Sequence, residues 1–121
     1  MTVDVNDATN IVPGTALVKL STTAATALVN NAVSSGTLIM VTSIVIVNED
    51  TANTTYITVS RYSQDDIGGT AYHLLNQVDI APGSPLQLLE HPIFLDEDKS
   101  LGATAEAAND MVVQVDYLTF S

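Results

Sequence analysis

Two histidines carry the only imidazole side chains of the sequence, so they are the first candidates for acid–base or nucleophilic chemistry. His73 lies in an apolar run beside Tyr72 and Leu74, and His91 precedes Pro92 at an expected bend. A catalytic histidine needs a nucleophile and an orienting group within hydrogen-bond reach, and no Gly-x-Ser-x-Gly or similar frame surrounds either residue. We therefore interpret both as surface or strand-end histidines.

Two acidic turns contain the residue types that bind calcium, because Ca²⁺ is ligated by carboxylate oxygens. They are Asp96-Glu97-Asp98 and Asp65-Asp66. An EF-hand loop that starts at Asp96 needs Gly at position 101 and Glu at 107, but the sequence has Leu101 and Ala107. We interpret both turns as solvated loops, with a calcium site of another geometry as the alternative. The sequence thus indicates no catalytic residue, no metal site and no cofactor.

The composition is strongly acidic. The chain contains 14 Asp and Glu residues but only three Lys and Arg residues, which gives a formal net charge of −11. A polyanionic surface repels phosphate groups, which argues against nucleic-acid binding. The chain has no cysteine, so disulfides, thiolate nucleophiles and cysteine-based zinc sites are excluded. With 46% hydrophobic residues, a chain of 121 residues can form one domain with a core.

The β-branched residues and their alternation predict strands throughout. The chain contains 15 Thr, 14 Val and 8 Ile, and the apolar residues recur with a period of two. Strands are expected at residues 16–20, 27–29, 37–47, 56–60, 72–75, 78–80, 86–88, 101–107 and 111–117. No segment indicates a helix. We expect an all-β fold, a two-sheet antiparallel sandwich of about eight strands, with jelly-roll and immunoglobulin-like topologies both open.

Three of these segments carry specific expectations. The run 37–47 is apolar on both faces and is expected to be a central strand covered on both sides, with Ile39, Val41, Val45 and Val47 together on one face. Residues 48–53 are polar and are expected to form a hairpin loop to the next strand. The last strand is expected to point Met111, Val113, Val115 and Tyr117 inward.

The acidic residues fall mostly in the expected loops, which leaves the strands nearly uncharged. The loop set comprises Asp4, Asp7, Glu49, Asp50, Asp65, Asp66, Asp96, Glu97, Asp98 and Asp110. Strand faces with so little charge are candidates for packing against neighbouring subunits.

The domain organisation follows from the first residues. Residues 1–14 are polar, acidic and aperiodic, and we expect an extended N-terminal arm there, followed by a single β-sandwich domain at residues 15–121. The arm could order on a neighbouring subunit. No signal peptide is visible, and the longest apolar stretch, Leu38 to Val47, is half the length of a spanning helix, so no membrane contact is expected.

Several segments together resemble a known group of proteins. These are the apolar strand Val41–Asn48, the Thr/Val strand Tyr56–Val59, the turn Ile80–Ser84, the pattern Leu95-x-x-Asp98-x-x-Leu101, and the closing strand Val112–Tyr117. Over residues 20 to 120 the chain resembles the small β-sandwich virion proteins of tailed bacteriophages, which are head-decoration, neck or tail components. It departs from their commoner form at residues 32–36, where those proteins have a Pro-Ala-Gly-like turn.

The resemblance implies a structural protein and not an enzyme. It implies a capsid decoration (cement) protein on the outer head surface that stabilises contacts between capsid subunits, or alternatively a neck or tail component. The implied partners are the major capsid protein or other virion subunits, and the implied state is a homo-oligomer, with a trimer as our guess. The implied location is the virion, assembled in the host cytoplasm. A carbohydrate- or receptor-binding module is a further alternative, although four Tyr, two Phe and no Trp are few aromatics for a sugar site.

Overall fold

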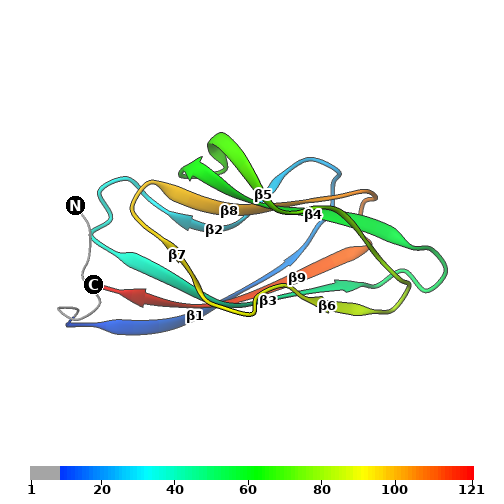
Figure 1. The fold of residues 1–121 in the computed structure, drawn as a ribbon, viewed down its shortest axis with the longest axis horizontal. Coiled ribbons are helices and arrows are strands. Elements are labelled where there is room, and N and C mark those ends of the chain that lie inside the picture. The colour runs from blue at the N-terminus through cyan, green and yellow to red at the C-terminus, as the bar shows by residue number, and fades with distance from the viewer. Residues whose placement is uncertain (1–8) are drawn as a thin grey trace.

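In a computed structural model, residues 9–121 are described, and they form two antiparallel β-sheets packed face to face (Figure 1). The strands are β1 (Ile11–Lys19), β2 (Thr26–Asn31), β3 (Leu38–Asn48), β4 (Thr55–Gln64), β5 (Gly68–Ile80), β6 (Pro85–Gln87), β7 (Ile93–Leu95), β8 (Lys99–Ala105) and β9 (Met111–Phe120). No helix occurs in residues 9–121, so none there could span a membrane. The predicted all-β, two-sheet sandwich is confirmed.

The strand order identifies the topology. Sheet A has the order β1-β9-β3-β6, with β7 also paired to β3, and sheet B has the order β2-β8-β4-β5. The pairs are therefore nested: β1 with β9, β2 with β8, β3 with β6 and β7, and β4 with β5. In a jelly roll the first strand pairs with the last, the second with the second-last, and so on inward, with successive pairs placed in alternate sheets. The pairing found here follows this pattern. An immunoglobulin-like sandwich would pair the first two strands in one sheet, whereas here they lie in different sheets.

The core lies between the sheets and follows the predicted alternation on the last two strands. Met111, Val113 and Val115 of β9 are completely buried. On β8, Leu101 and Ala103 face the same core, whereas Thr104, the next residue along the strand, points away from it. Completely burying one side chain of Val or Leu size stabilises a fold by about 1.5–3 kcal/mol, so these alternating positions are what hold the sheets together.

Strand β3 corrects one prediction. Val45 and Val47 do not share a face with Ile39 and Val41, because the pairing with β9 shifts register between Val41 and Ser43. This β-bulge adds one residue to β3 and reverses the alternation beyond it. Ile44 and Ile46 are therefore the completely buried residues of the second half. The strand is central in sheet A, but its outer face is not fully covered.

The prediction of a β3–β4 hairpin was wrong, because β3 belongs to sheet A and β4 to sheet B. The connecting loop crosses between sheets and is held by side chains. Buried Asn48 donates from Nδ2 to the carbonyls of Asn53 (3.0 Å) and Ile80 (2.9 Å). Asp50 Oδ1 accepts from the Ala52 N–H at 2.8 Å, and this bond is the main reason that the pKa of Asp50 is lowered from its usual 3.8.

Two further boundaries differ from the prediction. Strand β1 begins at Ile11, inside the expected arm, because Ile11–Gly14 pair with Phe120–Tyr117 of β9; residues 1–8 lie outside the described part. Pro13 is tolerated there because β1 is an edge strand. The two short strands expected at 72–75 and 78–80 are parts of the single strand β5, which is interrupted by irregular pairing.

A buried asparagine closes the opposite end of the sandwich. Asn31, at the end of β2, is 2% exposed, and its side chain makes four hydrogen bonds. Its Nδ2 donates to the carbonyls of Thr37 (3.0 Å) and Leu95 (2.9 Å). Its Oδ1 accepts from the hydroxyls of Ser35 (2.5 Å) and Thr37 (3.0 Å). One side chain thus joins β2, the β2–β3 loop and β7.

We expect the substitution Asn31→Ala to lower the free energy of unfolding by about 2–4 kcal/mol, because it leaves buried carbonyls without a donor. The neighbouring residue provides a matched control. Asn30 is exposed, and Asn30→Ala should change the stability by about 0.5 kcal/mol or less. Urea unfolding of both variants tests this, and equal effects would contradict the role given to Asn31.

Candidate interaction surface

The structure places His73 beside a buried serine. His73 lies on β5 directly opposite Ser60 of β4, and Ser60 Oγ is 2.6 Å from His73 Nδ1. Ser60 is only 3% exposed, so a substrate cannot reach its hydroxyl. Among the described residues, no carboxylate bonds to the imidazole as an orienting acid. The pair is thus a cross-strand contact that satisfies a buried hydroxyl, and its geometry does not suit nucleophilic catalysis.

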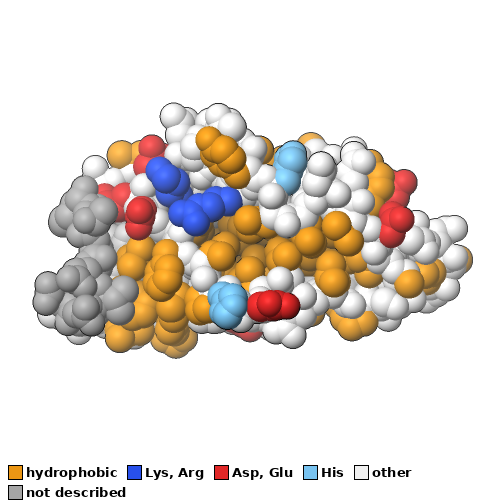
Figure 2. All heavy atoms as spheres, viewed as in Figure 1, with side chains coloured by type: hydrophobic (Ala, Val, Ile, Leu, Met, Phe, Trp, Pro, Cys, Tyr) orange, Lys and Arg blue, Asp and Glu red, His pale blue; other side chains and the backbone are white. Residues whose placement is uncertain are grey.

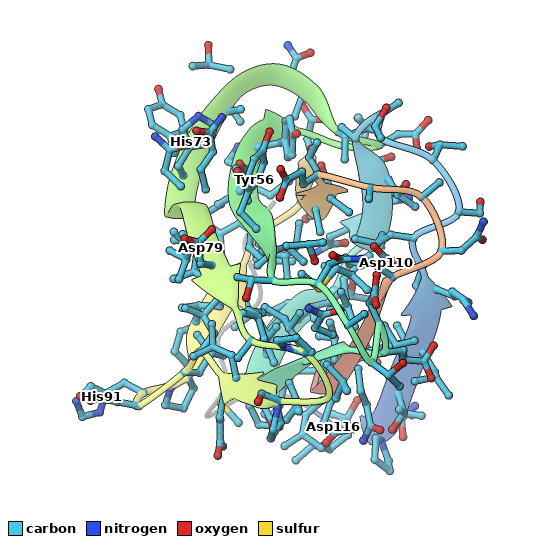
Figure 3. All side chains as sticks on the ribbon, turned by 90° about the vertical axis from the view of Figure 1, so that its right-hand side faces the viewer. Tyr56, His73, Asp79, His91, Asp110 and Asp116 are labelled. Carbon is cyan, nitrogen blue, oxygen red and sulfur yellow. The ribbon has the colours of Figure 1, made fainter. Side chains whose placement is uncertain are left out.

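The other sequence candidates do not converge on His73. His91 is exposed in the β6–β7 loop and points away from the body of the protein, far from His73 (Figure 3). The labelled carboxylates Asp79, Asp110 and Asp116 also lie on separate parts of the structure (Figure 3). The described residues therefore bring together no acid–base or nucleophilic set.

The two acidic turns are neighbours in space, which the sequence did not indicate. The N–H of Asp65 donates to Asp98 Oδ1 at 3.0 Å, so the β4–β5 turn contacts the β7–β8 loop. Within the described chain, however, no group of three or more His, Asp or Glu side chains has an arrangement that could hold a metal ion. This contact between loops is structural: a backbone donor satisfies part of one carboxylate.

Sequence reasoning missed Ile67, which closes the β4–β5 turn. Asp66 and Ile67 have φ values of 54° and 51°, and Gly68 N–H donates to Asp65 O at 3.1 Å, as in a type I′ turn. A β-branched residue is strained at positive φ, so its surroundings must compensate. They do so through Gly102 of β8, where a Cβ atom would come within 2.7 Å of Ile67 Cγ2.

This turn covers part of the outer face of sheet B. Gly102 faces away from the core, yet it is buried because Ile67 and Tyr62 lie over it. Ser100 fixes the arrangement: its Oγ accepts from the Ile67 N–H at 2.8 Å and donates to Gln64 O at 2.7 Å. The hairpin therefore occupies the surface that a neighbouring protein would need in order to pack flat on sheet B.

On the outer face of sheet A, Leu38 and Phe120 are buried, while other apolar residues around them are exposed or half-buried. Near the end where β1 begins, cross-strand neighbours on this face are apolar, and we name this group the sheet-A patch. It consists of Ile11, Pro13, Met40, Phe94 and Leu118. Ile11 is 55% and Phe94 42% exposed. Figure 2 shows apolar side chains gathered at this end, at the lower left of the view.

An open depression of about 520 Å³ lies next to the sheet-A patch. Pro13 and Leu118 line its apolar side, and Thr15, Thr42 and Asp116 line its polar side. The Asp116 carboxylate accepts from Thr15 Oγ1 at 2.9 Å, and the bulge residue Thr42 donates from Oγ1 to Asp116 O at 3.1 Å. An apolar wall beside an oriented carboxylate can receive a side chain that combines apolar carbons with a donor group.

The charges lie elsewhere, as predicted. Within the described residues, Asp79 and Asp116 are the only acidic residues in strands. The others lie in loops, and Figure 2 shows acidic side chains at both ends of the molecule. The sheet-A patch is therefore an apolar surface of low charge on a highly charged protein, which favours contact with another protein.

Comparison with known proteins supports the fold and goes no further. No family model matches the chain, and no curated protein matches it. A solved structure from Bacillus endospore appendages, described as a novel family of disulfide-linked pili, is similar with a TM-score of 0.51. The two share 15% sequence identity, and the alignment covers 92% of this chain and 88% of that chain. At this identity the similarity shows a shared fold.

The two histidines give a matched test of the Ser60–His73 contact. We expect His73→Ala to lower the free energy of unfolding by about 1–2 kcal/mol, because the buried hydroxyl of Ser60 loses its partner. His91→Ala should have an effect of about 0.5 kcal/mol or less, because His91 is exposed. Urea unfolding measures both. A larger loss for His91→Ala than for His73→Ala would contradict the structural role of His73.

Proposed function

We propose that this chain is a non-enzymatic structural subunit that attaches to neighbouring subunits of a larger particle through the outer face of sheet A. The observation that carries the proposal is the sheet-A patch, an exposed apolar surface on a chain with a net charge of −11. Exposed apolar side chains gathered on one face are characteristic of protein contact surfaces. The acidic loops supply the solubility that such a subunit needs before assembly.

Three features favour attachment over catalysis. The histidines lie far apart, and the serine beside His73 is buried. The depression beside the sheet-A patch is open and contains one carboxylate, Asp116, which already accepts a hydrogen bond. Such a surface binds and orients a partner's side chain, but it provides no second group to transfer a proton or attack a bond.

The particle that we propose is a tailed-bacteriophage virion. In this proposal the chain is a capsid decoration protein on the outer head surface that binds the major capsid protein and stabilises contacts between capsid subunits. The support is the sequence resemblance over residues 20 to 120, and the charge agrees with it, since an acidic subunit suits the outside of a DNA-filled head. A neck or tail component is the alternative within the virion.

A filament subunit is the second candidate. It is favoured by the similarity in fold to the Bacillus appendage structure, which covers 92% of this chain. The filament would differ from the disulfide-linked pili named there, because this chain contains no cysteine. Its subunits would be held together by non-covalent contacts alone.

Immunogold labelling of the particles produced by the source of the chain distinguishes these proposals. Label distributed over phage heads is the expected result. Label at the neck or tail would replace the decoration proposal with its alternative, and label along filaments would favour the second candidate. Label on soluble protein alone, with no particle stained, would overturn the structural role.

The substitution Phe94→Glu should reduce binding of the purified chain to its particle by about tenfold or more, because it places a charge in an apolar contact surface. Co-sedimentation with particles that lack the chain measures binding. Tyr72→Glu is the matched control, since Tyr72 is 61% exposed on sheet B and should bind as the unmodified chain does. Loss of binding in Tyr72→Glu, with Phe94→Glu unaffected, would place the contact on sheet B.

A further inference from the structure

The free edge of β1 offers hydrogen-bonding groups that no described residue uses. Asn10 and Ser121 exchange both backbone hydrogen bonds, and the Leu20 N–H donates to Met111 O at 2.9 Å. In an antiparallel pair the bonded residues alternate, so the even-numbered residues of β1 bond to β9. The odd-numbered residues, including Thr15, Leu17 and Lys19, therefore point their N–H and C=O groups away from the sheet.

This edge has few of the features that block pairing with another chain. The β1–β9 register runs without a bulge from Ile11 to Lys19. By contrast, β5 has three register shifts against β4 and a positive φ at Gln77, and β2 has one shift against β8. Strands β6 and β7 have three residues each. Natural proteins block their edges with bulges, short strands, prolines and lysines. Strand β1 has nine residues and no bulge, but it contains Pro13 and Lys19.

Pro13 limits how a second strand can pair with β1. It is an odd-numbered residue, so its missing N–H lies on the free edge. When two β1 strands pair antiparallel about a twofold axis, a register centred anywhere from Val12 to Ala16 places Pro13 opposite a residue of the partner's β1. A register centred on Leu17 pairs Leu17 with itself and Thr15 with Lys19, and Pro13 then faces the chain beyond the partner's β1.

The same register brings opposite charges together. Lys19 lies opposite Thr15 of the second copy, and Asp116 is the β9 neighbour of Thr15. The Thr15 hydroxyl holds the Asp116 carboxylate toward β1. Strands in a sheet are about 4.8 Å apart, so a lysine can reach across one strand to that carboxylate. Lys19 also lies 3.4 Å from Glu49, but both side chains are about half exposed and such a pair is weak.

We propose that two copies of this chain pair through their β1 edges, antiparallel about a twofold axis at Leu17, so that sheet A continues from one copy into the other. Leu17, which is 68% exposed, meets Leu17 of the second copy on the axis. Lys19 of each copy lies near Asp116 of the other. The pairing goes beyond the proposed particle role, since it requires only the chain itself, and it closes at two copies, unlike a trimer.

Because the chain contains no cysteine, single cysteine substitutions report the pairing directly. With a short bis-maleimide, the substitution Leu17→Cys should give a covalent dimer of twice the 12.7 kDa chain. Hydrogen-bonded antiparallel neighbours have Cα atoms about 5.5 Å apart, within reach of the reagent. Ile11→Cys is the matched control on the same strand: in this register its two thiols are about 40 Å apart, and no dimer should form.

The charge pairs give a second test by sedimentation velocity of the full chain. Lys19→Glu should weaken dimerisation by about three- to tenfold, and adding Asp116→Lys should restore it. Val33→Lys, at an exposed loop position, should leave it unchanged. The proposal is overturned if Leu17→Cys gives no covalent dimer, or if Ile11→Cys cross-links equally well. If no dimer forms but particles are labelled, the dimer proposal is wrong and the structural role stands. If the dimer forms but no particle is labelled, the structural role is wrong and the dimer proposal stands.

Discussion

The extra residue in β3 at Thr42 is the constraint on which the rest of sheet A depends. A strand without the bulge would turn Ile44 and Ile46 to the outer face and would point Asn48 away from the loop carbonyls that it binds. With the bulge, both isoleucines are buried in the core. The Thr42 hydroxyl donates a hydrogen bond to Asp116 O. One inserted residue thus determines which residues of β3 enter the core and places Thr42 among the polar residues beside the sheet-A patch.

The features that depend on local alternation of apolar residues could be predicted from the sequence. The features that depend on which distant strands pair with each other could not. The buried residues of β9 follow a period of two, which is visible in any window that contains them. The bulge at Thr42 has no such signal, because Thr and Ser are ordinary strand residues. The β3–β4 crossing was missed because sheet membership is set by partners far along the chain. Strand β7, at Ile93–Leu95, is too short for a periodic pattern.

The sequence predicted that an uncharged strand face would form the candidate interaction surface, but not which sheet would provide it. The uncharged strand faces followed from the sequence, and the structure confirms that acidic residues concentrate in loops. The sequence did not indicate which sheet is available. That choice depends on Ile67, which folds over Gly102 from a turn 35 positions earlier and covers sheet B. The strained φ of Ile67 is stabilised by this contact, and the consequence is that sheet A carries the exposed apolar face.

The charges restrict the direction in which copies can associate. Glu49, Asp50, Glu106 and Asp110 lie in the loops at one end of the sandwich. The contact between Asp65 and Asp98 brings two acidic loops together at the other end. Two copies that approach end to end therefore meet like charges, which opposes association at low salt. Within the described strands only Asp79 and Asp116 are acidic. Among the edge strands, only β1 extends over more than three residues without a register shift. Loop charge thus disfavours stacking, and the pattern of bulges selects one lateral edge.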